Sequence, residues 1–433
     1  MAREMKNSGI EWIGEIPAEW DVLSFTKSIE SIVDYRGKTP EKQDEGTLLI
    51  TARNIKDGKI DYSISKEYVR TEEFDQIMHR GKVEIGDVLF TTEAPLGSVA
   101  NADRTDFALA QRIIKFRGKS NVLDNYFLKY WIMSDGFQQN LSTFSTGSTA
   151  LGIKASKLGM LKQVLPSIDE QMRIVEFLDN EGSRIDSVID KTRASIEEYK
   201  KLKQAVITQA VTKGIRPDRQ LKDSGIEWIG AIPVNYSVER IKHLGNYRNG
   251  LTYAPEDIVD EEFGTLVLRS SNIQQGRLCF EDNVYVDSVI PERLMVQKDD
   301  IIICSRNGSR ELIGKCAIVE EDIKASFGAF MMSFRGKTPK YMYYILNSNV
   351  FKYYLSTFLT STINQLTGSN FGNMAVVWCD DQIEQAEIVE YLDHKTAEFD
   401  LLIQKKEQLL SSLESYKKSL IYEYVTGKKE VPA

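Results

Sequence analysis

The chain has 433 residues, of which 42% are hydrophobic and 27% charged, and its net charge is −8. This length exceeds one ordinary core and predicts two to four domains, and the apolar fraction is that of a folded protein rather than a disordered one. No run approaches the roughly 18 apolar residues that a membrane span needs. Residues 1–7 are polar and lack the apolar stretch of a secretory signal, so a cytoplasmic location is expected.

The chain contains two copies of one unit. Residues 8–14 read Ser-Gly-Ile-Glu-Trp-Ile-Gly, and residues 224–230 read the same. Residues 171–179 are echoed by residues 385–393, and Val-Thr at 211 returns at 425. A protein built from two copies presents two related surfaces, which suits a target that comes in two halves.

The first part of each copy is rich in aromatic and turn residues and predicts mixed α and β structure. Strand-like runs bounded by Gly, Pro, Asn or Asp are expected first, with a helical pattern after them. In copy one the strands are expected at 47–50, 87–91 and 112–116, with a helix near 125–140; in copy two they are expected at 265–268, 300–304 and 331–334, with a helix near 340–357.

The second part of each copy predicts one long helix. Residues 169–212 contain no proline and a single glycine, Gly182, and residues 381–426 contain neither. Large or apolar residues recur at every seventh position, which is typical of a coiled-coil seam. They are Leu178, Ile185, Tyr199 and Val206 in one helix and Leu392, Phe399, Leu413 and Leu420 in the other. The remaining position of each seven-residue series is occupied by Thr192 in the first helix and by Lys406 in the second. Further apolar residues lie between them: Val188, Ile189, Ile196 and Leu202, and then Leu402, Ile403, Leu410 and Tyr416.

Two such helices can bury their stripes on each other as an antiparallel pair. Each would be roughly 65 Å long, or on the order of 20 base pairs of DNA, and the pair would hold two domains at a set distance. The alternative is two unrelated amphipathic helices, each packed on its own domain. The predicted fold is α+β, with two mixed α/β domains in pseudo-twofold arrangement at 1–167 and 215–380. Long helices at 168–214 and 381–433, the second with a C-terminal tail, would form the antiparallel coiled coil.

Motifs for catalysis or metal binding are not found in the sequence. Residues 308–316 approach a phosphate-binding loop but have five residues between the glycines, and Cys follows the Lys. The cysteines at 279, 304, 316 and 379 form no C-x-x-C pair, and the three histidines are scattered. We therefore expect no catalytic, cofactor or metal site on this chain, although an enzyme whose site is assembled from distant residues remains an alternative.

Polar, turn-rich loops at similar places in both copies suit the reading of DNA. Arg pairs with guanine and Asn or Gln with adenine, and glycine allows close approach to a phosphate. The candidate DNA-binding residues are Arg36, Lys38, Arg53, Asn54, Ser148, Thr149, Lys154, Lys157, Arg248, Asn249, Arg269, Asn272, Arg306, Asn307, Ser309, Arg310, Thr362, Asn364 and Gln365. The alternatives are that these loops are ordinary surface turns, or that the chain is a protein-only adaptor. The acidic net charge is unusual for a protein that binds phosphates unaided.

The whole chain resembles the specificity subunit of type I restriction–modification systems. The resemblance lies in the paired Ser-Gly-Ile-Glu-Trp-Ile-Gly segments, in the helix starts at 170–179 and 384–393, and in the segments 34–40 and 306–310. It implies two target recognition domains that each read one half of an asymmetric, split DNA site, with the coiled coil setting the gap.

The same resemblance implies the partners. Two modification subunits would dock on the chain and methylate adenine with S-adenosylmethionine. Restriction subunits would add translocation and cleavage that need ATP and Mg²⁺. None of these cofactors would be held by this chain, and the partners would supply part of the grip on DNA.

Overall fold

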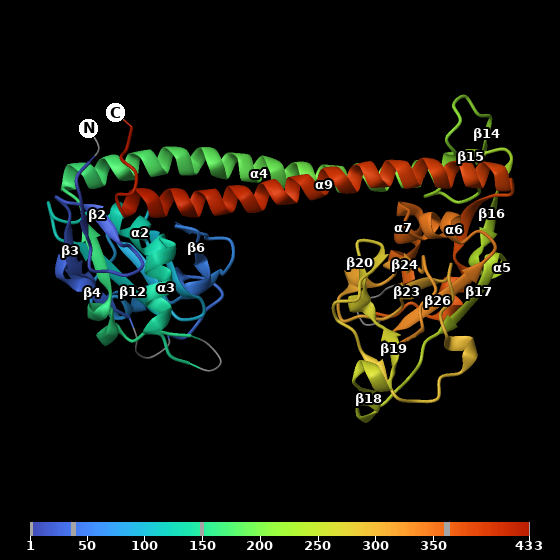
Figure 1. Ribbon diagram of the computed structural model, residues 1–433, viewed down its shortest axis with the longest axis horizontal. Helices are drawn as coiled ribbons and strands as arrows, with labels where there is room; N and C mark the ends of the chain where they lie inside the picture. The colour runs from blue at the N-terminus through green and yellow to red at the C-terminus, as the bar shows by residue number, and fades with distance from the viewer. Residues whose placement is uncertain (1–2, 36–39, 148–150, 359–363, 433) are drawn as a thin grey trace. The chain divides into compact units, whose positions relative to one another are not determined.

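The computed structural model describes residues 3–35, 40–147, 151–358 and 364–432. The chain forms two compact units, coloured by position along the chain in Figure 1. Unit 1 comprises residues 1–192 and 408–433, and unit 2 comprises residues 193–407. The domain ranges expected from the sequence treat each long helix as a separate segment, whereas the contacts divide each helix between the two units.

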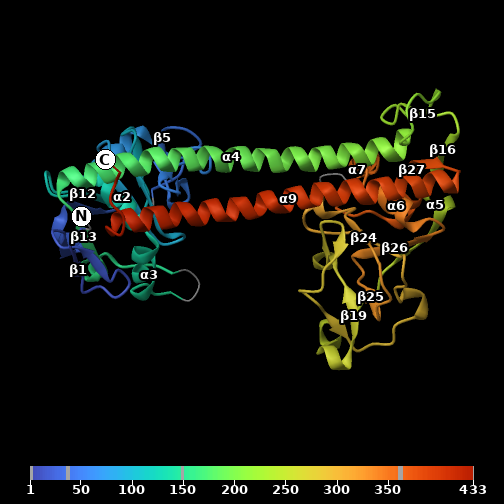
Figure 2. The same ribbon diagram turned by 45° about the horizontal axis from the view of Figure 1, so that its top comes forward.

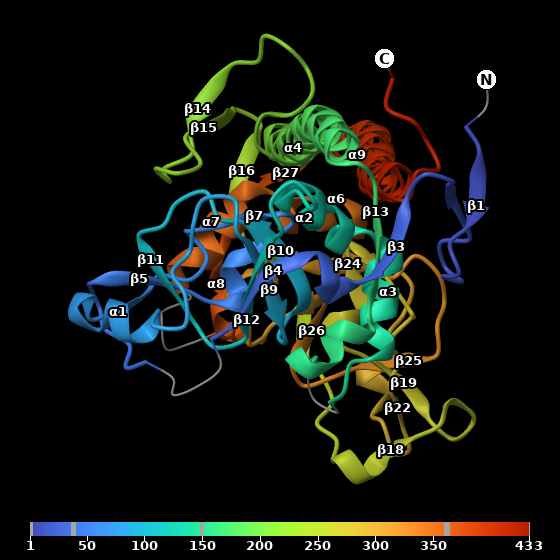
Figure 3. The ribbon, with the colours of Figure 1, turned by 90° about the vertical axis from the view of Figure 1, so that its left-hand side faces the viewer.

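Unit 1 is built on a four-stranded antiparallel sheet in the order β10-β9-β12-β4. The strands and helices of this unit are β1 (Met5–Asn7), β2 (Glu15–Pro17), β3 (Asp21–Ser24), β4 (Ile29–Asp34), β5 (Thr47–Ile50), β6 (Ile55–Lys56), β7 (Lys59–Ile60), β8 (Glu67–Val69), α1 (Phe74–Ile77), β9 (Val88–Thr92), β10 (Leu96–Asn101), β11 (Phe107–Leu109), β12 (Ile113–Gly118), α2 (Asn125–Met133), α3 (Asp135–Thr143) and β13 (Lys162–Leu165). Figure 3 looks onto this unit, with α2 between the sheet and the long helices.

Unit 2 repeats this plan with the sheet order β17-β26-β23-β24. Its elements are β14 (Leu221–Asp223), β15 (Ala231–Pro233), β16 (Tyr236–Arg240), α5 (Ile241–Leu244), β17 (Gly245–Asn249), β18 (Ile258–Val259), β19 (Thr265–Leu268), β20 (Ile273–Gln274), β21 (Arg277–Leu278), β22 (Tyr285–Val286), β23 (Ile301–Cys304), β24 (Cys316–Ile318), β25 (Ala325–Phe327), β26 (Met331–Gly336), α6 (Pro339–Leu346), α7 (Asn349–Phe358), α8 (Gly368–Asn373) and β27 (Ala375–Cys379).

The central strand of each sheet separates two hydrophobic clusters. In β9, Val88 and Phe90 belong to one cluster and Leu89 to the other. In β23, Ile301 and Ile302 divide in the same way. Successive side chains of a strand point to opposite faces, so a continuous apolar run is the pattern of a strand that is buried on both sides.

A serine divides each helix that the sequence predicts as continuous. Ser134 lies between α2 and α3, and its hydroxyl accepts a hydrogen bond from the backbone N–H of Phe137 at 3.4 Å. Ser348 does the same for Phe351 at 3.4 Å. A serine at this place satisfies a backbone donor that a new helix would leave free, and it therefore begins a second helix rather than extending the first.

The long helices α4 (Ile168–Lys213) and α9 (Gln382–Val425) run antiparallel. In unit 1 the start of α4 lies beside the end of α9, with the ring centroids of Phe177 and Tyr424 4.4 Å apart. In unit 2 the end of α4 lies beside the start of α9, where the Lys203 ammonium is 2.6 Å from the Asp400 carboxylate. Figure 2 shows the two helices side by side in each unit. The predicted antiparallel pair is confirmed, and the alternative of two separate helices is wrong.

The seam between the helices is narrower than the sequence predicts. Four of the residues predicted for the seam are buried as expected: Leu178, Ile185, Leu392 and Leu420. Thr192, the polar residue of the same seven-residue series, is buried as well. Other apolar residues predicted to join the stripe are instead 40–53% exposed. They are Val188, Leu202, Leu402 and Tyr416. A seven-residue period leaves a narrow contact on each helix, so residues next to the seam face outward.

Equivalent hydrogen bonds join a long helix to a short helix in each unit. The Tyr130 hydroxyl of α2 donates to Asp179 of α4 at 2.5 Å, and the Tyr344 hydroxyl of α6 donates to Asp393 of α9 at 2.6 Å. The duplication therefore extends from the sequence to individual hydrogen bonds. Within the described residues, no helix is long and apolar enough to cross a membrane.

Candidate nucleic-acid interface

Loops from several strands meet at one edge of the main sheet in unit 2. The end of β23 pairs with the start of β26, Cys304 opposite Met331, so the loops that follow and precede these strands lie together. A hollow of about 1000 Å³ opens there. Its wall includes Tyr253, Arg269, Ser270, Asp282, Arg306, Asn307, Phe330, Asn364 and Gln365. The structure thus brings together residues from three of the loops that the sequence predicted separately.

Arg306 is held at the centre of this edge by its backbone. The N–H groups of Ser305 and Arg306 both donate to the carbonyl of Phe330, at 2.9 and 3.1 Å. The N–H of Leu366 donates to the carbonyl of Ser305 at 2.7 Å, and Arg306 pairs with Gln365 as an isolated β-bridge. We call these backbone contacts the edge frame of unit 2. They fix the backbone position from which each loop side chain extends, independently of the residue type at that position.

The guanidinium of Arg306 lies over an aromatic ring. Its central carbon is 5.1 Å from the centroid of Phe330, whose side chain is 57% exposed. Arginine stacks on aromatic faces while its donors remain available at the rim. The pair therefore presents an oriented cation at the surface of the hollow.

Neighbouring polar residues of the hollow hold one another. The Arg269 guanidinium is 2.9 Å from the Asp282 carboxylate, so its charge is partly neutralised. The side-chain amide of Asn307 donates to the Ser270 hydroxyl at 3.0 Å and ties two loops together. Neutralisation by Asp282 makes Arg269 a weaker phosphate ligand than its exposure suggests.

Other predicted residues of unit 2 lie outside the lining of the hollow. Arg248 donates to the carbonyl of Arg293 at 3.0 Å, and Asn249 is exposed at the end of β17. Arg310 donates to the carbonyl of Ser356 at 3.1 Å, and Ser309 precedes it in the same loop. The hydrogen bond of Arg310 turns its guanidinium toward α7.

In unit 1, three of the predicted residues that the structure describes are exposed cations. Arg53 is 65% exposed and lies 3.1 Å from the Glu67 carboxylate. Lys154 and Lys157 are exposed; Lys154 precedes the 3-10 helix Ala155–Met160, and Lys157 lies within it. Both lysines can contact phosphates, which position a protein on DNA without reading sequence.

Two asparagines predicted to read bases are inside the protein. Asn54 and Asn272 are both 0% exposed. The Asn54 amide donates to the carbonyls of Asp61 and Ser65, and its oxygen accepts from the backbone of Thr51. Asn272 makes the equivalent contacts in unit 2. The prediction is wrong for both, because an asparagine that follows a strand can close a turn as well as contact a base. Five other candidates lie outside the described residues: Arg36, Lys38, Ser148, Thr149 and Thr362.

Sequence reasoning missed Phe330 and Tyr253, which line the hollow. Phe330 directly precedes the predicted strand at 331–334 and belongs to none of the candidate loops. Its only signal was its position next to Gly328 and Ala329, where a strand leaves a loop.

The three buried cysteines of unit 2 have raised thiol pKa values because of their burial. Burial raises the pKa of the Cys316 thiol to about 12 and that of Cys379 to about 11, so both stay protonated near neutral pH. Among the residues that the structure places, no group of three His, Cys, Asp or Glu side chains could hold a metal ion.

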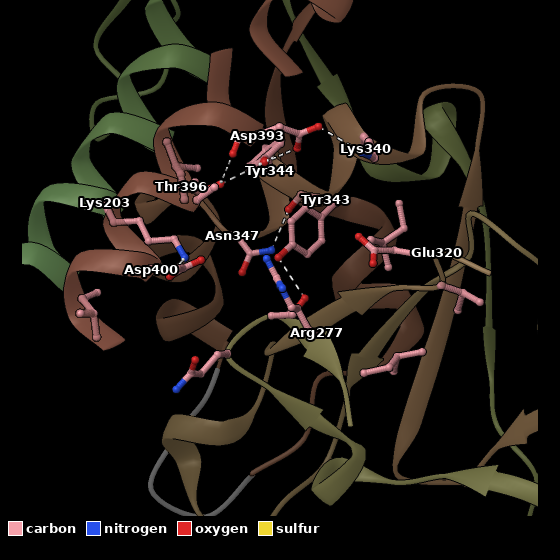
Figure 4. Close-up of a pocket in the computed structure, with 18 of the residues that line it drawn as sticks. Lys203, Arg277, Glu320, Lys340, Tyr343, Tyr344, Asn347, Asp393, Thr396 and Asp400 are labelled. Atoms are coloured by element: carbon pink, nitrogen blue, oxygen red, sulfur yellow. Dashed lines mark hydrogen bonds and ion pairs between the residues drawn. The ribbon is translucent and has the colours of Figure 1, made fainter. Parts of the chain in front are cut away.

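A second hollow in unit 2, of about 840 Å³, lies between α6, the β20–β21 hairpin and the long helices (Figure 4). Its charges are largely paired: Lys340 is 3.0 Å from Asp393, and Lys203 is 2.6 Å from Asp400. Paired charges of this kind stabilise the join between helices and domain, and they leave little net charge for DNA.

The chain therefore has two mixed α/β units, each with loops gathered at one edge of its main sheet and each including one end of the antiparallel helices. Residues 26–198 match the family model of the type I restriction modification DNA specificity domain. A putative MjaX specificity subunit of Methanocaldococcus jannaschii is 28% identical, and the match covers 54% of each chain. The StySPI specificity subunit of Salmonella potsdam is 22% identical over 96% of this chain and 90% of its own.

A solved structure shares the fold. That structure is described as the structural basis of complex assembly and conformational transition of the type I R-M system. Its TM-score is 0.72 at 16% identity, and the match covers 96% of the present chain and 99% of the other. The chain is thus similar to type I restriction–modification specificity subunits in sequence, and it shares the fold of this solved structure.

Proposed function

We propose that this chain supplies DNA sequence specificity to a type I restriction–modification complex, each unit reading one half of a split, asymmetric site. The observation that carries the proposal is a sheet edge repeated in both units with different side chains on it. A shared backbone scaffold with different donors and acceptors is what two readers of different half-sites require.

The long helices set the separation between the half-sites. Helix α4 has 46 residues, which at 1.5 Å per residue gives about 69 Å, or on the order of 20 base pairs. Because α4 and α9 run antiparallel, lengthening both changes the gap without altering either reading edge.

Partner subunits carry the chemistry. Two modification subunits bind the helices and methylate adenine with S-adenosylmethionine, and restriction subunits use ATP and Mg²⁺; this chain has no catalytic role. Each unit exposes an equivalent pair of apolar helix residues: Val188 and Tyr416 in unit 1, and Leu402 and Leu202 in unit 2. Two like apolar surfaces suit two copies of one partner. A complex that acts on the cell's own DNA works in the cytoplasm.

The decisive test is to map methylated adenines in cells that carry the system. We expect a split motif with two unlike halves and a fixed gap. One heptad is then inserted after Thr192 in α4 and another after Glu407 in α9, at the division between the units. This should widen the gap by about 3 base pairs and leave both half-sites unchanged. An unchanged gap, in a complex that still methylates, would remove the helices' measuring role.

Docking is tested with L202E and Y416E, one exposed apolar residue from each unit. Each charge should weaken assembly with the modification subunit, as measured by size-exclusion chromatography with light scattering. The matched control is E407K, a charge change at an exposed helix position. Full assembly by both Glu variants would place the partner elsewhere.

A further inference from the structure

The edge frame of unit 2 has a counterpart in unit 1. The N–H of Thr92 donates to the carbonyl of Arg112 at 2.8 Å, and the N–H of Ile153 donates to the carbonyl of Thr92 at 3.0 Å. Glu93 pairs with Gly152 as an isolated β-bridge. In unit 2, Ser305 makes the same two backbone hydrogen bonds with Phe330 and Leu366. We call them the edge frame of unit 1.

Matching the two edge frames aligns residues that the sequences alone do not pair. Glu93 takes the place of Arg306, because each follows the central strand and forms the isolated bridge. Arg112 takes the place of Phe330, because the carbonyl of each accepts the bond from the central strand. The same two positions thus carry Glu and Arg in unit 1, and Arg and Phe in unit 2.

In unit 1 these side chains bind each other. The Arg112 Nε lies 2.9 Å from the Glu93 Oε1, and the two side chains are 49% and 40% exposed. An ion pair this exposed adds little to stability. The backbone of Arg112 also has φ +83°, a left-handed conformation that is uncommon for residues other than glycine. The Thr92 hydroxyl holds the same carbonyl at 3.2 Å. Backbone conformations of this kind concentrate at functional sites.

We propose that these two positions form the base-reading pair of each unit, and that each pair reads a G·C base pair. The reader is Arg112, held in place by Glu93, in unit 1, and Arg306, held in place by the Phe330 ring, in unit 2. This inference rests on the proposed function. Arginine donates two parallel hydrogen bonds to O6 and N7 of guanine in the major groove. A guanidinium that is already oriented loses less rotational freedom on binding.

The unlike supports separate the two units chemically. Glu93 can also accept a hydrogen bond from the amino group of the paired cytosine, so unit 1 contacts both bases. Phe330 has no such acceptor, so unit 2 contacts guanine alone. Unit 1 should therefore discriminate more sharply at its G·C pair than unit 2.

The test uses the assembled complex and duplexes in which each base pair of the mapped site is replaced in turn. R112A should abolish about 10- to 100-fold discrimination at one G·C pair in one half-site, and R306A should do the same in the other half-site. R112K and R306K keep the charge but lose the paired donors, so they should lose discrimination while retaining most of the affinity. E93Q should cause a partial loss at the position that R112A affects.

Matched controls come from the same units. Arg104 of unit 1 also pairs with a carboxylate, Asp106, but it follows the end of β10 at the opposite edge of the sheet. Arg277 of unit 2 lines the second hollow instead of the reading edge. R104A and R277A should leave the base preference unchanged.

Each outcome bears on the proposal. Equal weakening on all duplexes by R112A and R306A would make both arginines phosphate contacts and overturn it. Loss of discrimination at an A·T pair, or none at all, would also overturn it while the proposed function stands. If the unsubstituted complex shows no sequence preference, the proposed function itself fails.

Discussion

The tryptophan of the repeated heptapeptide occupies different surroundings in the two units. Trp12 packs against Trp131 in unit 1, with ring centroids 5.7 Å apart, and lies over Gly136. Trp228 in unit 2 is 41% exposed and packs on Tyr353 and Tyr354 of α7. Identical local sequence therefore does not fix the environment of a side chain.

One helix position beneath the tryptophan differs between the two units. A Cβ built on Gly136 would lie 2.0 Å from the Trp12 ring, so only glycine fits beneath it. The equivalent position of unit 2, two residues after the capping Ser348, holds Val350. A branched side chain at this position leaves no room for a ring placed as Trp12 lies over Gly136.

A buried carboxylate provides a second comparison. Asp87 receives two hydrogen bonds from Arg117 and lies 3.2 Å from the Lys115 ammonium, which is 3% exposed. Asp300 receives the same two bonds from Arg335, but the position of Lys115 is taken by Ser333. Unit 1 thus buries one more charge than unit 2 at the same point in the sheet.

The largest expected effect is from removing this carboxylate. Asp87→Ala should destabilise unit 1 by about 3–5 kcal/mol, because it leaves the buried Lys115 ammonium without a carboxylate and with only the Lys82 carbonyl as a hydrogen-bond acceptor. Asp300→Ala should cost unit 2 about 1.5–3 kcal/mol, because Arg335 can turn toward water. Hydrogen exchange of the backbone amides of β12 and β26 measures the stability of unit 1 and of unit 2 separately. D87A/K115M should recover part of the loss, and equal costs in the two units would show that Lys115 is not the reason for the difference.

The tryptophan comparison predicts the next largest effect. Gly136→Val should force Trp12 out of its place and destabilise unit 1 by about 1–3 kcal/mol, the usual cost of overpacking. Tryptophan fluorescence should shift toward that of an exposed ring. Trp228→Ala is the control and should cost less, because that ring is already half exposed. A silent Gly136→Val would mean that Trp12 has another place to pack.

Acid should weaken unit 1 through Asp87. Burial works to raise the pKa of this carboxyl, but hydrogen bonds from Arg117 and the Glu84 backbone, together with nearby Lys115, hold the pKa below 3.8. The unfolded chain binds more protons in that window, so the stabilisation is present above about pH 4 and is lost as the pH falls through the folded pKa. Hydrogen exchange of β12 should therefore change more steeply below pH 4 in the unsubstituted protein than in D87A. Parallel curves would exclude Asp87 as the titrating group.

The smallest effect concerns the helix seam. Asp186 is 2.5 Å from Lys417 and 3.5 Å from Lys59, whereas Asp400 is 2.6 Å from Lys203. Asp186→Asn should cost about 0.5–1 kcal/mol and Asp400→Asn about 0.2–0.5 kcal/mol, since partly exposed pairs contribute little. Urea unfolding at low and high salt checks this, because screening should reduce both costs. A larger cost for Asp400→Asn would reverse the comparison.

Much of the architecture could be predicted from the sequence because it is periodic or repeated. The long helices were expected at 169–212 and 381–426, and they run over Ile168–Lys213 and Gln382–Val425. The reading edge was partly predictable, since Arg306 and Gln365 lie in polar loops that adjoin apolar strands. Asn54 was not, because a buried turn-closing asparagine and an exposed base-reading one follow a strand in the same local sequence.

By itself, the sequence determined the duplication, the helical period and the position of the loops, because each is a property of neighbouring residues. The tertiary structure decided which half of each long helix belongs to which unit. It also decided that Glu93 meets Arg112 where Arg306 meets Phe330. Such pairs are brought together by hydrogen bonds between separate strands, and no local pattern records which strands will be neighbours.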